Sequence, residues 1–347
     1  MLSYLIVGFY VSLFFCALGI YLSYRGVIKS APHEGPQKFH KDYVPRLGGA
    51  GIFFALVALN LLALLRNEVY FRELFLLSTF ASLVFSVGLI EDLTSNLAPR
   101  LRLFLTAFFS LIFCLSIEVN PFLAGVYALF LTTVIHGFNL IDGFNGLASI
   151  VCVVSLLGTG FVAFEVGNIF VATISLGIAG ALLGFFVFNY PAGLIFLGDG
   201  GAYLIGFLSA SLGLILIIEN RQVSPLFALL VQVYPLLEVG FSFYRRAILR
   251  KRSPFLPDAL HLHSLIYRRL IKSLIKNPKA EHIRNPATSP FLWVMNSFGV
   301  LPAITFWDNT TVLALFFLVF IVVYVFAYFR VLMKKAPQWS RRRRGLR

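Results

Sequence analysis

The chain has 347 residues, of which 59% are hydrophobic and only 13% carry a charge, about half the charged fraction of ordinary soluble domains. This composition excludes a water-soluble globular protein and indicates an integral membrane protein. A net charge of +14 would suggest a nucleic-acid partner for a soluble chain. We expect no nucleic-acid partner here, because membrane topology explains the positions of the basic residues better.

Apolar runs of about 20 residues recur along the chain, each long enough to cross ~30 Å of bilayer hydrocarbon. The runs are continuous rather than alternating, so they predict helices and not the strands of a membrane barrel. The sequence predicts an all-α, polytopic bundle of about 11 spans, or 10 if the run interrupted by Asn296 and Pro302 does not cross. The expected spans are residues 2–23, 48–65, 74–90, 102–117, 121–138, 147–164, 169–189, 200–218, 223–243, 290–306 and 311–332.

The basic residues fall almost entirely on one side of this topology. The odd-numbered loops and the C-terminal tail hold 26 of the 29 Lys and Arg residues, and only Arg66, Arg72 and Arg221 lie opposite. Because basic residues are retained in the cytoplasm, we expect a periplasmic N-terminus and a cytoplasmic C-terminus. We expect one membrane domain (1–333) and a basic tail (334–347), whose RRRR run suits topology and anionic lipid binding equally. The expected cytoplasmic loops are residues 24–47, 91–101, 139–146, 190–199 and 244–289.

Each expected cytoplasmic loop carries a cluster of polar residues, whereas the opposite loops hold only single acids such as Glu118, Glu165 and Asp308. Clusters that are distant in sequence but share one membrane face are what the parts of one active site would look like. The clusters are KFHKDYVPRLGG (38–49), GLIEDLTSNLAPRLRL (88–103), NLIDGFNGLA (139–148), FLGDGGAYLIGF (196–207) and PDALHLHSLIYRR (257–269).

The 88–103 cluster places Glu91 and Asp92 side by side where a span ends. Such a pair can bind a divalent cation, or one carboxylate can act as a base whose pKa is set by the other. The alternative is a solvated charge pair at a helix end. Arg100 and Arg102 follow at the start of the next span, where they could meet a lipid phosphate.

In the 139–148 cluster, Asn139, Asp142 and Asn145 are spaced three residues apart, which would put all three on one helix face. Gly143 and Gly146 permit a turn or a close backbone approach to a ligand. The alternative is a polar patch that packs two spans together.

Asp199 stands among glycines at the start of a span. Helix N-termini and glycine-rich turns bind phosphate through backbone N–H groups, and an Asp there can hold a phosphate-bound Mg²⁺. A simple N-cap explains the Asp equally well.

His261 and His263 lie close to Arg268 and Arg269 in the last loop. Histidines at i and i+2 do not share a helix face, so they make a poor zinc site by themselves. Histidine and arginine together suit a diphosphate. The alternative is a pair of exposed loop histidines with no role.

Taken together, the clusters offer acids, amides, glycine-rich turns, histidines and arginines, with no thiol nucleophile and no Ser-His-Asp pattern. Phosphoryl transfer needs such groups: a divalent metal and basic side chains for a diphosphate, and a carboxylate for the attacking oxygen. A site at the cytoplasmic membrane surface implies one soluble and one lipid substrate.

The ordered motifs GLIEDLTSNLAPRLRL, NLIDGFNGLA, FLGDGG and HLHSLIYRR resemble the polyprenyl-phosphate N-acetylhexosamine-1-phosphate transferases, or glycosyltransferase family 4. This family includes the initiators of several surface polysaccharides and the phospho-MurNAc-pentapeptide transferase. The resemblance runs from about residue 38 to residue 269. It implies transfer of N-acetylhexosamine 1-phosphate from a UDP-sugar to undecaprenyl phosphate, with Mg²⁺ or Mn²⁺, in the bacterial cytoplasmic membrane. A homodimer would be unsurprising.

The resemblance also implies residue roles. Glu91 and Asp92 match the family's paired aspartates, Asn139 and Asp142 match its NxxDG motif, and Asp199 matches its metal-binding aspartate. The implied catalytic residues are Glu91, Asp92, Asp142 and Asp199, and the implied metal ligands are Asp92, Asp142 and Asp199. The residues implied for the nucleotide sugar are Lys38, Arg46, Asn139, Asn145, His261, His263 and Arg268, and those implied for the lipid phosphate are Arg100 and Arg102.

The sequence departs from the family pattern in three places. Glu91 replaces an aspartate, and Asn145 replaces the second acid of DGxDG, which suggests a supporting role there. The HLHSL run replaces three successive histidines, which favours a surface-polysaccharide initiator over the pentapeptide transferase. A multi-span transporter is a different-class alternative, but it predicts acids within the spans and inverted repeats. The identity of the sugar stays open between GlcNAc, GalNAc, QuiNAc and FucNAc.

Overall fold

The computed structural model describes residues 1–27, 44–118, 120–249, 251, 260–277 and 280–334. Within these ranges every regular element is a helix, as predicted. Lys38 and nearly all of the basic tail lie outside the described residues. The elements are α1 (Leu2–Tyr24), α2 (Gly48–Leu65), α3 (Phe71–Thr94), α4 (Pro99–Ile117), α5 (Pro121–Ile141), α6 (Leu147–Glu165), α7 (Ile169–Asn189), α8 (Gly198–Glu219), α9 (Pro225–Val231), α10 (Val233–Phe243), η1 (Tyr244–Leu249), α11 (Leu262–Leu265), η2 (Ile266–Ile271), α12 (Lys272–Leu274), α13 (Glu281–Arg284), η3 (Pro286–Thr288), α14 (Ser289–Thr305) and α15 (Thr310–Met333).

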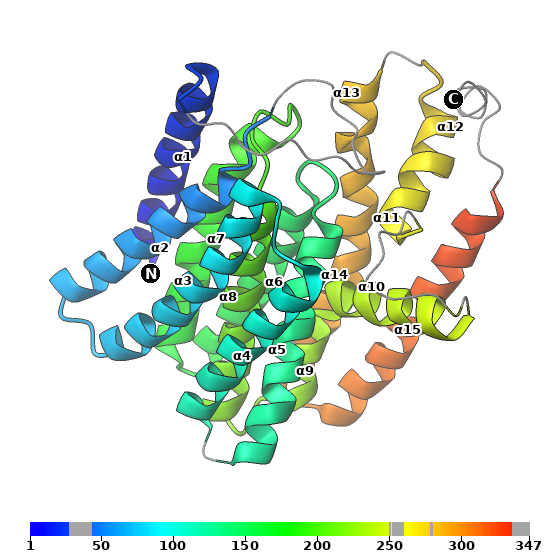
Figure 1. Cartoon of the computed structure of the whole chain (residues 1–347). Coiled ribbons are helices and arrows are strands. Elements are labelled where there is room, and N and C mark those ends of the chain that lie inside the picture. The colour runs from blue at the N-terminus through cyan, green and yellow to red at the C-terminus, as the bar shows by residue number, and fades with distance from the viewer. Residues whose placement is uncertain (28–43, 119, 250, 252–259, 278–279, 335–347) are drawn as a thin grey trace.

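In the described part of the chain, nine helices are long and apolar enough to cross a membrane, namely α1 to α8 and α15. The bent pair of α9 and α10 brings the number to ten. Figure 1 shows α1 and α15 at opposite edges of this bundle. The structure therefore confirms a polytopic helical bundle, whereas the side of the membrane on which each terminus lies stays a prediction.

Helix α14 accounts for the difference from the expected number of about 11 spans. With 17 residues it is at the lower limit of a spanning length. Its first residue, Ser289, donates to the carbonyl of Asn145 at 2.6 Å. Beyond its other end, the carbonyl of Trp307 accepts from the backbone N–H of Ser224 at 2.9 Å. The contact with Asn145 lies at a loop on one side of the bundle, and the contact with Ser224 lies at a loop on the other side. Helix α14 therefore still runs from one side of the bundle to the other.

The expected span 223–243 is not continuous, because it bends by 77° between α9 and α10, and α10 lies across the neighbouring helices in Figure 1. Pro235 has no N–H to donate to the carbonyl of Val231, four residues earlier. That carbonyl instead accepts from the hydroxyl of Ser155 at 2.5 Å. A neighbouring helix thus satisfies the interrupted backbone at Val231, and the side-chain amide of Gln232 at the break donates to the hydroxyl of Ser209 at 2.6 Å.

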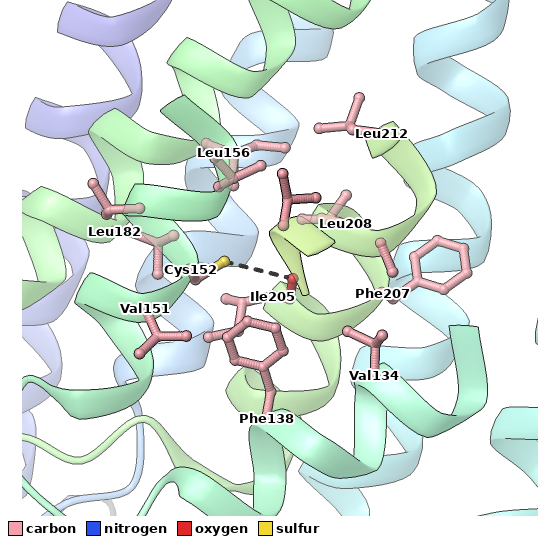
Figure 2. Packing of buried hydrophobic residues seen from close by; sticks show 14 of the residues in the cluster. Val134, Phe138, Val151, Cys152, Leu156, Leu182, Ile205, Phe207, Leu208 and Leu212 are labelled. Carbon is pink, nitrogen blue, oxygen red and sulfur yellow. Dashed lines mark hydrogen bonds between the residues drawn. The ribbon is translucent and has the colours of Figure 1, made fainter. Parts of the chain in front are cut away.

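Helix α8 lies in the core of the bundle, where its residues from Gly200 to Leu216 are all buried. Figure 2 shows α5, α6 and α7 packed around it, with the thiol of Cys152 donating to the carbonyl of Ile205 at 3.7 Å. A Cβ built on Gly88 of α3 would lie 2.4 Å from the backbone nitrogen of Gly200. The absence of a side chain at Gly88 therefore lets the end of α3 approach the start of α8 closely.

Candidate functional site

Side chains from the ends of four helices meet around Asp199, at the start of α8. One carboxylate oxygen of Asp199 accepts from Arg102 Nη1 of α4 at 2.7 Å, and the other accepts from Asn139 Nδ2 of α5 at 3.0 Å. The same Arg102 nitrogen lies 3.5 Å from Glu91 Oε1 at the end of α3. Three clusters that are distant in sequence therefore form one group, as the sequence predicted. We call Glu91, Arg102, Asn139 and Asp199 the Asp199 cluster.

Asp92 lies directly behind this cluster and caps α8 from a different helix. Its Oδ1 accepts from the backbone N–H of Asp199 at 3.0 Å, and its Oδ2 accepts from that of Gly200 at 2.9 Å. Gly198 adopts a φ of +78°, and a Cβ there would lie 2.6 Å from Asp92 Oδ2. Only glycine fits this approach. These contacts favour a positioning role for Asp92, while the metal-binding role implied for it stays a prediction.

The residues before α2 pair with the turn that leads into α8. Gly48 donates to the carbonyl of Phe196 at 2.9 Å, and Phe196 donates to the carbonyl of Pro45 at 2.9 Å. This pairing brings Arg46 beside the capping carboxylate, with its Nη1 3.7 Å from Asp92 Oδ1. Arg46, in the described part of the 38–49 cluster, therefore also lies at the site.

Asp142 follows the last residue of α5 and carries a strongly perturbed carboxyl. Burial and the neighbouring negative charge of Asp199 raise its pKa from an ordinary 3.8 to about 7, although Arg46 offsets part of the rise. A carboxyl that titrates near neutral pH in a polar cluster is a candidate for proton transfer or for cation binding.

The expectation that Asn139, Asp142 and Asn145 share one helix face is wrong beyond Ile141, where α5 ends. The glycines that follow permit a turn, and Gly146 has a φ of +75°. Asn145 is buried in this turn and ties loops together: its backbone N–H donates to Asn285 Oδ1 and its Nδ2 to the carbonyl of Pro191, both at 2.9 Å. This arrangement agrees with a supporting role, and a contact with the nucleotide sugar remains a prediction.

Both predicted histidines are buried, which excludes the alternative of exposed loop residues. The rings of His261 and His263 stack, with centroids 5.4 Å apart and planes at 9°. A Cβ built on Gly143 would lie 3.7 Å from His263 Nε2, so this nitrogen faces the residue after Asp142. Burial lowers the pKa of His263 to about 3; the negative charge of Glu238 opposes this decrease, and His261 and Arg268 add to it. His263 is therefore neutral at physiological pH.

The arginines of the predicted site differ in how exposed their side chains are. Arg102 is turned into the Asp199 cluster, where its Nε is buried without a hydrogen-bond partner and can still serve as a donor. Arg100, two residues earlier on α4, is exposed. Arg268 is half-buried and close enough to His263 to act on it electrostatically.

Sequence reasoning missed two charged residues beside the histidines. Glu238 of α10 is 1% exposed and places Oε2 3.4 Å from His261 Nδ1. Arg246 places Nη2 3.5 Å from His261 Nε2. Hydropathy predicted an unbroken apolar span here. An acid inside such a span is itself an indication of function and could have pointed to Glu238.

Among the described residues, no group of three or more His, Cys, Asp or Glu side chains could hold a metal ion. Mg²⁺, however, is usually held by one or two carboxylates together with substrate phosphates. The repulsion between Asp142 and Asp199 contributes to the raised pKa of Asp142, and a divalent cation would relieve it. These two carboxylates therefore fit a metal that binds together with a diphosphate.

Comparison with known proteins agrees with this geometry. The model of the family described as "Glycosyl transferase family 4" matches residues 74–217, which include the whole Asp199 cluster. A Thermotoga maritima protein named undecaprenyl-phosphate alpha-N-acetylglucosaminyl 1-phosphate transferase is 29% identical over 242 residues, 68% of this chain and 72% of that protein. The central part of this chain is therefore similar to glycosyl transferase family 4.

Other relatives differ in how much of the chain they cover. A Bacillus subtilis protein, named a probable undecaprenyl-phosphate N-acetylglucosaminyl 1-phosphate transferase, is 25% identical over 278 residues, 75% of this chain and 76% of that protein. A phospho-N-acetylmuramoyl-pentapeptide-transferase of Streptococcus thermophilus is 40% identical, but over only 109 residues, 30% of this chain and 31% of that protein. Among these relatives, the longer matches thus carry the N-acetylglucosaminyl name.

Proposed function

We propose that this chain transfers N-acetylhexosamine 1-phosphate from a UDP-linked sugar to undecaprenyl phosphate, giving undecaprenyl-diphospho-N-acetylhexosamine and UMP. The single observation that carries the proposal is the Asp199 cluster, which joins acids, an amide and an arginine from four helix ends. The names of the longer-matching relatives supply the substrate class. The product would initiate a surface polysaccharide.

In the proposed reaction, an oxygen of the lipid phosphate attacks the phosphorus that carries the sugar, and the bond from that phosphorus to the bridging oxygen breaks. UMP leaves with the bridging oxygen. Arg102 is the cation of the cluster, its side chain is 18% exposed, and we assign it to orient the lipid phosphate. Glu91, 3.5 Å from the same arginine and not assigned to the cation, is the carboxylate that can accept a proton from that phosphate.

We assign the cation to Asp199 and Asp142, with Mg²⁺ favoured and Mn²⁺ as the alternative. When bound, the cation would neutralise the charge of the diphosphate. His261, His263 and Arg268 lie on the Asp142 side of the cluster and are assigned to the diphosphate of the nucleotide sugar. Asp92 holds the start of α8 in place for Asp199.

The asymmetry of 26 to 3 basic residues supports a multi-pass protein of the bacterial inner membrane with its site facing the cytoplasm. Pentapeptide transfer is the second candidate function, favoured by the 40% identity to the streptococcal protein. It is the weaker candidate, because that match covers only 30% of the chain and because two histidines stand in place of three.

A panel assay tests the proposal. Purified protein in detergent receives undecaprenyl phosphate and, one at a time, UDP-GlcNAc, UDP-GalNAc, UDP-QuiNAc, UDP-FucNAc and UDP-MurNAc-pentapeptide. We expect UMP release that requires the lipid, with a UDP-HexNAc as the substrate and GlcNAc as the first to examine. Release from the pentapeptide substrate alone would support the second candidate, and no lipid-dependent UMP from any sugar would contradict both.

A further inference from the structure

Glu238 is a carboxylate enclosed within the bundle, and its position is defined by the break at Gln232. The 77° bend turns α10 across the neighbouring helices and carries Glu238 toward the histidine segment. The side chain is 1% exposed. A carboxylate is costly to bury unless another group compensates its charge. One such group is His261, whose Nδ1 lies 3.4 Å from Glu238 Oε2.

Among the described side chains, Glu238 is the acid that approaches His261 Nδ1. The nitrogen is buried and has no hydrogen-bond partner among the described atoms, so its 3.4 Å ion-pair contact with Oε2 is the contact it has; Glu238 Oε1 likewise has no hydrogen-bond partner. Tyr234, one turn earlier on α10, and Tyr324 of α15 also interact electrostatically with the carboxylate. The acid is therefore the only anionic partner that the described side chains offer to Nδ1.

The segment around His261 is held from both sides. Arg245 donates to the carbonyl of Leu260 at 2.6 Å and to the hydroxyl of Tyr328 at 2.7 Å, which fixes the backbone just before the histidine. On the other ring nitrogen, Arg246 approaches His261 Nε2 to 3.5 Å. A cation beside Nε2 and an anion beside Nδ1 both favour the tautomer that carries its proton on Nδ1.

The orientation of His261 is passed on to His263 by contact. The two rings are stacked nearly parallel, and His263 Nε2 faces the turn that follows Asp142. A rotation of the first ring would therefore move the second. Partners of this kind, which orient a ligand-binding imidazole through its far nitrogen, are well known around metal sites.

We propose that Glu238 is a positioning residue: it fixes the Nδ1–H tautomer and ring plane of His261 and thereby holds His263 Nε2 toward the Asp142 turn. The identity of the ligand, a nucleotide diphosphate, rests on the proposed function. The tautomer of His261 does not, so it can be measured in protein without substrate.

The test compares Glu238→Gln with Tyr234→Phe, which removes a polar atom beside the same carboxylate without touching His261. Solid-state ¹⁵N spectra of histidine-labelled protein, assigned with His261→Gln, report the tautomer. We expect Nδ1–H in the natural protein and in Tyr234→Phe, and a loss of that form in Glu238→Gln. In the assay, Glu238→Gln should raise KM for the UDP-sugar by about 10-fold with a smaller change in kcat.

A double-mutant cycle separates positioning from a general structural effect. In a His261→Gln background, adding Glu238→Gln should change KM by less than about twofold, because the residue through which Glu238 acts is gone. If Glu238→Gln does not fold, Glu238→Asp replaces it. The Asp variant keeps the charge and should keep the tautomer, with a smaller KM effect that likewise disappears in the His261→Gln background.

An unchanged His261 tautomer in Glu238→Gln, or additive KM effects in the cycle, would overturn the proposal. If the natural protein shows no transfer activity but the tautomer responds to Glu238, the proposed function fails and the positioning role stands. If transfer is normal and the tautomer does not respond, only the positioning role fails.

Discussion

Asp92 and Asp199, which are 107 residues apart in the sequence, are joined by a hydrogen bond of 3.0 Å from the backbone N–H of Asp199 to Asp92 Oδ1. The contact makes one acid the N-terminal cap of the helix that presents the other. The adjacent Glu91 instead directs Oε1 toward Arg102 of the cluster, at 3.5 Å. The two neighbouring acids of α3 therefore have different structural tasks.

Substitution of the two acids should separate stability from activity. Asp92→Asn keeps the shape of the side chain but loses its charge and one of two acceptors, so we expect the free energy of unfolding to fall by about 1.5–3 kcal/mol. Glu91→Gln keeps one oxygen that can accept from the backbone N–H of Leu97, as Oε2 does at 2.9 Å, so it should lower the melting temperature less than Asp92→Asn while lowering kcat. Thermal unfolding in detergent and steady-state kinetics measure both. Equal losses of stability in the two variants would contradict the division of roles.

Asp199→Asn tests whether the charge of Asp199 is needed for catalysis. The amide has the same shape, but a hard cation requires anionic oxygen and the diphosphate charge must be offset as UMP leaves. We expect a folded variant with kcat lower by at least about 100-fold, which corresponds to ~2.7 kcal/mol of lost transition-state stabilisation. Higher Mg²⁺ should restore part of the loss, and Mg²⁺ titration of both proteins measures it. A near-normal rate with an unaltered Mg²⁺ dependence would leave Asp199 a structural residue only.

The raised pKa of Asp142 predicts how stability depends on pH. The folded protein binds this proton up to about pH 7, whereas the unfolded chain releases it near the ordinary value of 3.8. Between these values the folded state holds more protons, so the contribution of Asp142 to stability falls as pH rises. Melting temperatures from pH 4.5 to 7.5 should therefore fall more for the natural protein than for Asp142→Asn. Parallel curves for the two proteins would rule out this linkage.

Cysteine labelling tests the orientation in the membrane. The three native cysteines are buried, so they add little background. Ser95 and Ser273 are exposed in loops expected to be cytoplasmic, and Asn67 is exposed in a loop on the opposite side. In intact cells, an impermeant maleimide should label Asn67→Cys and spare Ser95→Cys and Ser273→Cys. The reverse pattern would invert the topology.

Sequence patterns predicted the convergence of the motifs because each motif lies at a span end on the basic side. Once the runs are helices, their alternating direction forces Glu91, Asn139 and Asp199 to one end of the bundle. The bend at Gln232 was not predictable from hydropathy, since both halves of the run are apolar. Pro235 was a visible cue to a kink, but its size depends on Ser155 and other distant groups.

The roles of individual polar residues depended on tertiary contacts that no local pattern carries. The capping of α8 by Asp92 is visible only in its two hydrogen bonds to that helix. The link that Asn145 makes between loops is visible only in its bonds to Pro191 and Asn285. The pairing of Glu238 with His261 follows only from the direction that α10 takes after the bend.

The central claim is that the phosphate attached to the sugar moves with the sugar to the lipid. A UDP-HexNAc labelled with ³²P on the phosphate that carries the sugar tests this claim directly, with undecaprenyl phosphate and the purified protein. We expect the label to appear in the lipid product and the released nucleotide to be unlabelled UMP. Label recovered in UDP, with sugar alone on the lipid, would contradict it.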